Sequence, residues 1–101
     1  MATFIFTYRV PHDYALGRPD AASAWSDWFA SMGDGLLDIG KPVAQAAALG
    51  DGDAGTRLGG YSLVTADDLD AALALAKGCP ALAIGGVVEV GALAELTGRA
   101  A

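Results

Sequence analysis

Residues 3–10 alternate between two kinds of side chain, and this pattern is the clearest structural signal in the chain. Four large apolar residues would share one face of an extended segment: Phe4, Phe6, Tyr8 and Val10. Because aromatic and β-branched residues at a period of two are typical of strands, residues 3–10 are predicted to form a strand. Pro11, Gly17 and Pro19 indicate a loop after it.

A helical pattern begins after this loop. Its large apolar residues recur at the spacing i, i+3, i+4 and i+7 and would form one stripe: Trp25, Trp28, Phe29 and Met32. Asp20 is predicted as the N-cap, and residues 33–35, which contain two glycines, are predicted to end the helix.

The stretch 36–49 gives mixed signals. Residues that suit a strand are interrupted by glycine and proline, and an alanine run that favours helix by propensity follows them. We interpret the stretch as a broken strand. Residues 50–55, rich in glycine and aspartate, predict a turn or loop, and residues 59–64 predict the next strand.

The last third of the chain predicts a second helix and a last strand. Residues 65–68 resemble a capping box, with Asp68 in place of the usual glutamate. The apolar stripe of the helix would be Leu69, Ala72, Leu73 and Ala76. Lys77 would lie in its last turn, where a cation suits the helix dipole. Residues 81–90, interrupted by two glycines, predict a strand.

The predicted order of elements is therefore βαββαβ. This order is typical of the α+β ferredoxin-like fold, an antiparallel sheet with two helices on one face. The other face of such a sheet would carry alternating apolar residues with nothing to cover them. A second copy of the chain is the commonest cover for such a face, so we expect a homodimer whose two sheets enclose a cleft.

Composition limits the possible functions. The chain has 101 residues, 53% of them hydrophobic and 18% charged, which predicts one globular domain over residues 1–101. A net charge of −6 argues against nucleic acid and anionic membranes as partners. The single cysteine, Cys79, excludes a disulfide within the chain and a cysteine-rich zinc site. No phosphate-binding or dinucleotide motif is present, so no cofactor is predicted, and we expect a cytoplasmic protein.

Several segments resemble the YCII-related domain family, in particular its DGPF branch. They are residues 58–64 (LGGYSLV), 67–72 (DDLDAA), 76–82 (AKGCPAL) and 88–90 (VEV), together with the tryptophan-rich first helix. The resemblance spans nearly the whole chain. It implies a dimeric α+β barrel. Some members of the family are suspected enzymes with a helix histidine paired to a downstream aspartate, one branch looks like lactone-isomerising or dehalogenating enzymes, and DGPF members tend to accompany sigma factors.

The departures from the family pattern bear on activity. The loop at 50–57 keeps only the Asp51-Gly52 part of the DGPF motif, and Gly91 stands where an arginine usually follows Glu-Val. The helix position that carries histidine in the suspected enzymes is Trp25 or Trp28 here. Activity that depends on those groups is therefore in doubt.

Four residues are candidates for proton-transfer chemistry. His12 is the only histidine and could act as a general base, or it could be a solvated loop residue. Asp13, Asp38 or Glu89 could orient it or share its proton. Glu89 lies in an apolar strand: it is either a partly desolvated functional carboxylate or a charge paired with an arginine such as Arg9 or Arg57.

Four aromatic residues are candidates for lining a cleft: Tyr8, Trp25, Trp28 and Tyr61. Their alternative role is packing in the core. The sequence thus predicts a small-molecule-binding YCII-related protein with an unidentified ligand and a cleft at the sheet face, whose chemistry, if any, would be of the lyase or isomerase type. The alternative is a non-catalytic regulatory or protein-interaction module.

Overall fold

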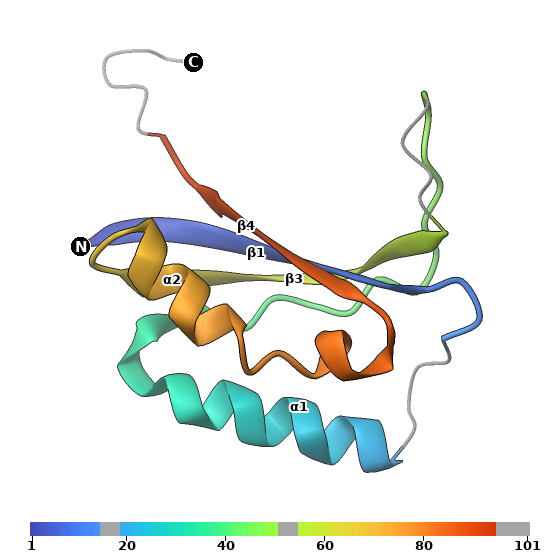
Figure 1. Ribbon diagram of the computed structural model, residues 1–101, viewed down its shortest axis with the longest axis horizontal. Coiled ribbons are helices and arrows are strands. Elements are labelled where there is room, and N and C mark those ends of the chain that lie inside the picture. The colour runs from blue at the N-terminus through green and yellow to red at the C-terminus, as the bar shows by residue number, and fades with distance from the viewer. Residues whose placement is uncertain (15–18, 51–54, 95–101) are drawn as a thin grey trace.

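The computed structural model describes residues 1–14, 19–50 and 55–94 and shows an α+β fold (Figure 1). Its strands and α-helices are β1 (Ala2–Pro11), α1 (Pro19–Met32), β2 (Leu36–Asp38), β3 (Thr56–Ala66), α2 (Leu69–Ala76) and β4 (Val87–Ala92). Two short 3-10 turns, Gly33–Gly35 and Pro80–Ile84, follow the two α-helices. The predicted order of helices and strands is confirmed.

The strands form one antiparallel sheet of four strands in the order β2-β3-β1-β4. Both helices lie on the same side of it (Figure 1). The long strands β1 and β3 form the centre, whereas β2 and β4 are the edges. This architecture is compatible with the ferredoxin-like fold.

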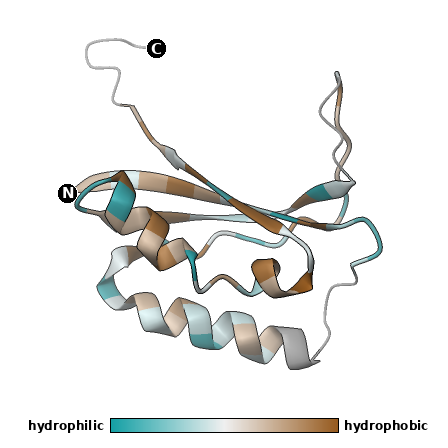
Figure 2. Cartoon of the chain, in the orientation of Figure 1, coloured by the Kyte–Doolittle hydropathy of each residue, from teal (hydrophilic) through white to brown (hydrophobic). Residues whose placement is uncertain are grey.

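The predicted alternation in β1 is present. The four large residues face the helices and are buried, and Phe6 is fully inaccessible. The residues between them, such as Ile5 and Thr7, are only partly buried and lie on the face that no helix covers, which we call the open face. Hydrophobic residues colour parts of β1 and β4 brown in Figure 2. Those on the open face include Ile5 of β1 and Val87 of β4, which pairs with Arg9.

Helix α1 packs on the sheet through its predicted stripe. Trp28 and Met32 are buried, and Trp25 and Phe29 pack against the same core while remaining partly exposed. The indole Nε1 of Trp28 donates to the carbonyl of Leu75 in α2 at 3.1 Å, which joins the two helices. Helix α1 begins at Pro19, so Asp20 lies within the first turn and the prediction of Asp20 as the N-cap was wrong.

The predicted start of α2 was also wrong. Thr65 is still part of β3, and its hydroxyl donates to the carbonyl of Gly35 at 3.5 Å. The N-cap is Asp68, whose side chain accepts from the backbone N–H of Ala71 at 2.8 Å. A carboxylate at the N-cap satisfies a backbone donor that has no partner within the helix. Lys77 follows the last helical residue.

The predicted stripe of α2 is correct in its alanines and incorrect in its leucines. Ala72 and Ala76 are buried against the sheet, whereas Leu69 and Leu73 are each more than two-fifths exposed. The half-buried members of the packed face are Ala71 and Leu75. Small side chains let the backbone of α2 approach the sheet closely, so the face richest in alanine points inward and the larger leucines lie at its margin.

The stretch 36–49 is a broken strand, as predicted. β2 is short, and after it the backbone pairs with β3 again through an isolated bridge between Pro42 and Gly60. Gly40 has a φ of +72°, and a Cβ there would lie 1.8 Å from the Tyr61 carbonyl oxygen, so only glycine fits. The alanine run at 44–48 forms neither helix nor strand.

The predicted strand over 81–90 is only half correct. Residues Pro80–Ile84 form a 3-10 turn, which Gly85 closes with a φ of +82°. The fixed φ of proline suits the first position of a helical turn, which explains why the apolar residues after Pro80 do not extend. β4 begins only at Val87 and pairs with β1.

Candidate functional site

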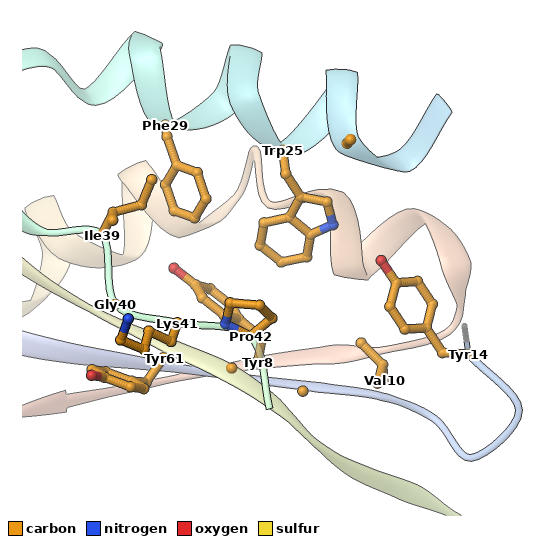
Figure 3. A pocket seen from close by; sticks show the side chains of 13 residues that line it. Tyr8, Val10, Tyr14, Trp25, Phe29, Ile39, Gly40, Lys41, Pro42 and Tyr61 are labelled. Carbon is orange, nitrogen blue, oxygen red and sulfur yellow. The ribbon is translucent and has the colours of Figure 1, made fainter. Parts of the chain in front are cut away.

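A cavity of about 300 Å³ lies between α1 and the sheet (Figure 3). We call it the α1 pocket. Helix α1 contributes Trp25 and Phe29, and β1 contributes Tyr8 and Val10. Tyr14, Ala22, the segment 39–42, and residues 59–61 of β3 complete the lining. Most of these residues are apolar or aromatic, as in sites for small organic ligands.

The α1 pocket lies where a helix faces the sheet with large aromatic side chains. Helix α1 faces the sheet with two tryptophans and a phenylalanine, whereas α2 faces it with Ala72 and Ala76. Large aromatic side chains that meet edge to face hold a helix further from a sheet than alanines do and leave gaps between rings. Trp25 and Tyr8 meet in this way, with ring centroids 4.8 Å apart.

Glycines allow the segment 39–42 to form one wall of the pocket. A Cβ at Gly60 would lie 3.2 Å from the carbonyl oxygen of Lys41, so this segment passes directly against β3. Pro42 bridges Gly60. The wall is therefore fixed to the sheet by backbone contacts, and its shape does not depend on a long side chain.

Arg57 fastens two margins of the pocket. Its Nη2 donates to the carbonyl of Tyr14 at 3.0 Å, and its Nη1 donates to the carbonyl of Val43 at 3.2 Å. These two carbonyls belong to the loop after β1 and to the segment after Pro42. Arg57 thus holds Tyr14 and Val43 near each other. Their proximity could not be predicted from the sequence pattern, because they are 29 positions apart in the chain.

The Tyr8 ring lines the pocket, but its hydroxyl is buried beside Ser62, which does not line the pocket. Tyr8 is only 4% exposed, and among the described residues its buried hydroxyl has no hydrogen-bond partner. The Ser62 hydroxyl is its polar neighbour but donates instead to the carbonyl of Ile39 at 2.7 Å. A buried hydroxyl without a partner costs free energy, so this group lowers the stability of the fold.

Burial keeps the Tyr8 side chain neutral. Loss of water around the ring raises the pKa of the phenol well above its usual range, and the nearby Ser62 hydroxyl offsets only part of this effect. At any physiological pH the group is therefore a phenol that can donate or accept one hydrogen bond, and it is not a phenolate base.

Three of the four predicted cleft-lining residues line the α1 pocket: Tyr8, Trp25 and Tyr61. Tyr61 contributes only at the margin: it pairs with Thr7 of the open face, and its ring lies beside Gly40 with the hydroxyl directed away from Trp25 (Figure 3). Trp28 is a core residue that stacks with Phe6. The pocket is on the helix-covered side of the sheet, whereas the sequence placed the cleft on the open face.

Sequence reasoning missed several lining residues. Phe29 belonged to the predicted α1 stripe, so its spacing from Trp25 carried a signal that it faces the sheet. Ile39 and Gly40 could not be found, because the path of the chain after β2 depends on backbone contacts with β3. Tyr14 lies in a loop, where no periodicity indicates a direction.

His12 and Asp13 lie in the turn after β1 and are exposed. They are neighbours in the chain but border different surface depressions: His12 lies with Arg9 and Arg57, and Asp13 lies beside α1. Neither residue lines the α1 pocket. His12 and Asp13 therefore do not contribute to the same depression on the surface.

Asp38 and Glu89 lie on opposite edge strands. Three strand spacings separate β2 from β4, which is about 14 Å at the usual spacing of about 4.8 Å. Glu89 is paired with Thr7 on the open face. β1 continues for four residues beyond Thr7 to Pro11, about 13 Å, and His12 lies in the turn after it. The four candidate proton-transfer residues therefore do not form one constellation within a single chain.

The two arginines considered as partners of Glu89 have other contacts. Arg9 donates from Nε and Nη2 to Thr56, at 2.9 and 2.8 Å, and Arg57 donates to backbone carbonyls. Within the described ranges no ion pair joins Glu89 to either arginine. Asp38 accepts from the backbone N–H of Gly40 at 2.9 Å, which helps to set the turn after β2.

Cys79 is a buried thiol at the start of the second 3-10 turn. Burial raises the pKa of this thiol to about 11, so it is protonated and a weak nucleophile at neutral pH. No group of three or more metal-binding side chains gathers in the part of the chain that the structure describes. Neither described helix is long and apolar enough to cross a membrane.

Comparisons of the chain with models of protein families, with curated proteins and with solved structures found no match.

Proposed function

We propose that the protein is a small-molecule-binding domain that holds its ligand in the α1 pocket. The observation that carries this proposal is a cavity of about 300 Å³ between α1 and the sheet, lined mainly by apolar and aromatic residues such as Trp25, Phe29 and Val10. Apolar walls with one or two fixed polar groups are what ligand sites of this size share.

Binding is proposed as the role in preference to proton transfer. Among the lining residues that the structure describes there is no histidine and no carboxylate, and the buried Tyr8 is a neutral phenol. General acid–base catalysis requires a group that exchanges protons near the working pH within reach of the substrate. His12 and its three candidate partners lie outside the pocket, so the enzymatic alternative lacks its base.

The proposal includes membership of the YCII-related family and a homodimer formed through the open face. The resemblance of the sequence supports the first part, and the partly exposed apolar side chains of the open face, such as Leu58, Tyr61 and Val87, support the second. Such a surface is typical of an interface between subunits. A protein-interaction role would use the same face, and a cytoplasmic location is proposed with it.

The binding proposal is tested with a pocket-blocking variant. Ala22 lines the pocket and lies at i−3 from Trp25 and i−7 from Phe29, so Ala22→Phe extends the aromatic row into the cavity. Ala30→Phe is the matched control, because Ala30 is an exposed alanine of the same helix that does not line the cavity. The assay is a titration with neutral monocyclic aromatic compounds, followed by NMR through the two indole N–H signals.

The expected result is that ligands shift the Trp25 indole signal and leave the Trp28 signal, whose N–H is already bonded to Leu75, nearly unchanged. Ala22→Phe should abolish the shift and Ala30→Phe should retain it. A compound set that shifts neither indole, or one that binds Ala22→Phe as well as the natural protein, would contradict the proposed function.

The dimer is tested by a charge placed on the open face. Leu63 lies on that face opposite Ile5, so Leu63→Lys should convert a dimer into a monomer in sedimentation velocity. Leu73→Lys is the control, because Leu73 is an exposed leucine on the helix side. A natural protein that sediments as a monomer at micromolar concentration would rule out this interface.

A further inference from the structure

We infer that the ligand of the α1 pocket is an uncharged single-ring compound whose carbonyl oxygen accepts hydrogen bonds from the Trp25 indole N–H and the Tyr14 hydroxyl. This inference rests on the proposed function and specifies the chemistry of the ligand. Three observations carry it: two accessible polar groups at one end of the pocket, the apolar lining of the rest, and the charges beside that end.

The two polar groups belong to lining residues of the pocket and are open to contact. In the part of the chain that the structure describes, neither the indole nitrogen of Trp25 nor the hydroxyl of Tyr14 has a hydrogen-bond partner. The Tyr8 hydroxyl is the side-chain group there that is both unbonded and shielded from solvent, so the other two groups are accessible. Figure 3 shows the Trp25 nitrogen on the edge of its ring that is nearer to Tyr14, and the Tyr14 hydroxyl directed toward α1.

This end of the α1 pocket borders a second hollow, the depression between α1 and the turn Pro80–Ile84. Trp25 and Tyr14 are lining residues of both hollows. The two polar groups therefore stand at the margin of the pocket and not in the core of the fold. A ligand with its ring in the α1 pocket would meet them with its outer end.

The rest of the pocket suits an apolar ring. Its lining there is apolar and includes Val10, Phe29, Ile39 and Pro42. A cavity of about 150 Å³ is known to take benzene, and the α1 pocket has about 300 Å³. The space therefore suits one aromatic ring with a substituent of a few atoms, and the polar atom of that substituent finds its partners at the Tyr14 end.

The polar atom of the ligand must be an acceptor. An indole N–H can only donate a hydrogen bond, whereas a phenol hydroxyl can donate or accept one. A carbonyl oxygen has two lone pairs and can accept from both groups. An ammonium group has donors only, so it would leave the Trp25 N–H without a partner.

The charges beside this end disfavour an anionic ligand. The described charged residues that line the depression between α1 and the turn Pro80–Ile84 are Asp13 and Asp27, both acidic. In the described lining of the α1 pocket the charged residue is Lys41, which is exposed and would stabilise an anion little because water and salt screen it. A carboxylate would lose hydration there without gaining a buried cation.

The test uses three probes of similar shape in the natural protein. Acetophenone is neutral and carries a carbonyl, α-methylstyrene replaces that carbonyl oxygen with a CH₂ group, and benzoate is an anion. Affinities come from NMR titrations. The Trp25 indole proton is expected to move further downfield with acetophenone than with α-methylstyrene, because only acetophenone can accept its hydrogen bond. Benzoate is expected to bind at least tenfold more weakly than acetophenone.

A pair of matched variants tests the second donor. Tyr14→Phe and Tyr61→Phe each remove one hydroxyl from the lining, but the Tyr61 hydroxyl is directed away from Trp25. Because the two neutral probes differ in their own hydration, the quantity compared between proteins is the ratio of their affinities. Tyr14→Phe should lower the ratio of acetophenone to α-methylstyrene roughly three- to tenfold, the loss of one neutral hydrogen bond. Tyr61→Phe should leave the ratio unchanged.

The outcomes separate this inference from the proposed function. If the ratio is the same in Tyr14→Phe as in the natural protein, if it falls equally in Tyr61→Phe, or if the Trp25 proton responds alike to both neutral probes, the inferred recognition is wrong although the pocket is a ligand site. Tighter binding of benzoate than of acetophenone overturns the inference as well. If no probe and no other neutral aromatic compound shifts the Trp25 indole signal, the proposed function itself fails.

Discussion

The two faces of the sheet use the same strands for different purposes. On the helix-covered face, β1 carries Phe6, which is fully buried in the core, and Tyr8, which lines the α1 pocket. On the open face, β1 carries Ile5 and Thr7, which are partly exposed. The covered face is therefore apolar and hollowed beneath α1. The open face carries apolar and polar residues, and no helix covers it. An enclosed hollow suits a small molecule, and an uncovered apolar sheet suits another protein surface.

This difference shows that the number of apolar residues on a face does not locate a ligand site. The open face has enough of them to attract a partner, but the cavity arises where aromatic rings of α1 meet the sheet without filling the space between them. Under α2, where alanines face the sheet, the packing is close. The size of the side chains on the covering helix therefore determines where the ligand is expected.

The largest expected effect is a difference in the free energy of unfolding between a substitution on the covered face and one on the open face. Phe6→Ala empties the centre of the core and should lower the free energy of unfolding by about 3–5 kcal/mol. Thr7→Ala changes the neighbouring residue on the open face and should cost about 1 kcal/mol or less. Urea denaturation followed by circular dichroism measures both, and equal losses would contradict the assignment of the two faces.

The close packing under α2 is tested by adding volume. Ala72 is fully buried, so Ala72→Leu should overpack the space between α2 and the sheet and cost about 1–3 kcal/mol. Ala74→Leu, at an exposed position of the same helix, should change the stability by no more than about 0.5 kcal/mol. Full tolerance of Ala72→Leu would mean that α2 also leaves a hollow above the sheet.

The cap that holds α2 over the sheet gives a smaller effect. Asp68→Ala removes the acceptor for the Ala71 N–H and should cost about 1 kcal/mol of stability. Asp67→Ala is the matched control, because Asp67 lies outside the cap and is exposed. Thermal unfolding should show a lower midpoint for the first variant only; an equal shift in both would indicate a general effect of charge.

The smallest effect concerns the thiol beneath the helices. Burial raises the pKa of Cys79 from 9.0 to about 11, so the unfolded chain loses this proton first as the pH rises. The stability that the neutral thiol contributes is therefore complete below about pH 9 and is lost as the pH approaches 11. Between about pH 8 and about pH 10, urea midpoints should fall more for the natural protein than for Cys79→Ala. Parallel curves would show that the thiol is not sheltered.

Local patterns in the sequence predicted much of the fold. Alternation in residues 3–10 and the aromatic stripe of α1 depend on periods that each segment carries by itself, and both are confirmed. The errors occur where a contact with another segment, and not the local pattern, determines where an element begins or ends. Thr65 continues β3 because pairing with Thr3 extends to the end of the strand, and Asp68 takes over the capping role.

The candidate site was harder to predict. Tyr8, Trp25 and Tyr61 were found because they are large aromatic residues in regular elements. The wall at 39–42 and the fastening of Tyr14 by Arg57 depend on contacts between segments that are distant in the chain. No period in the sequence carries such contacts. His12 and the carboxylates were chosen for their chemistry, and chemistry alone does not place residues in one cavity.

The central claim is that a small molecule binds on the helix-covered face under α1. The most direct measurement is the set of intermolecular nuclear Overhauser effects from a bound neutral monocyclic aromatic compound to the protein. The account predicts contacts from the ligand ring to the side-chain protons of Trp25, Phe29 and Val10. Contacts to Ile5 and Leu63, which lie on the open face, would place the ligand at the other side of the sheet and contradict the account.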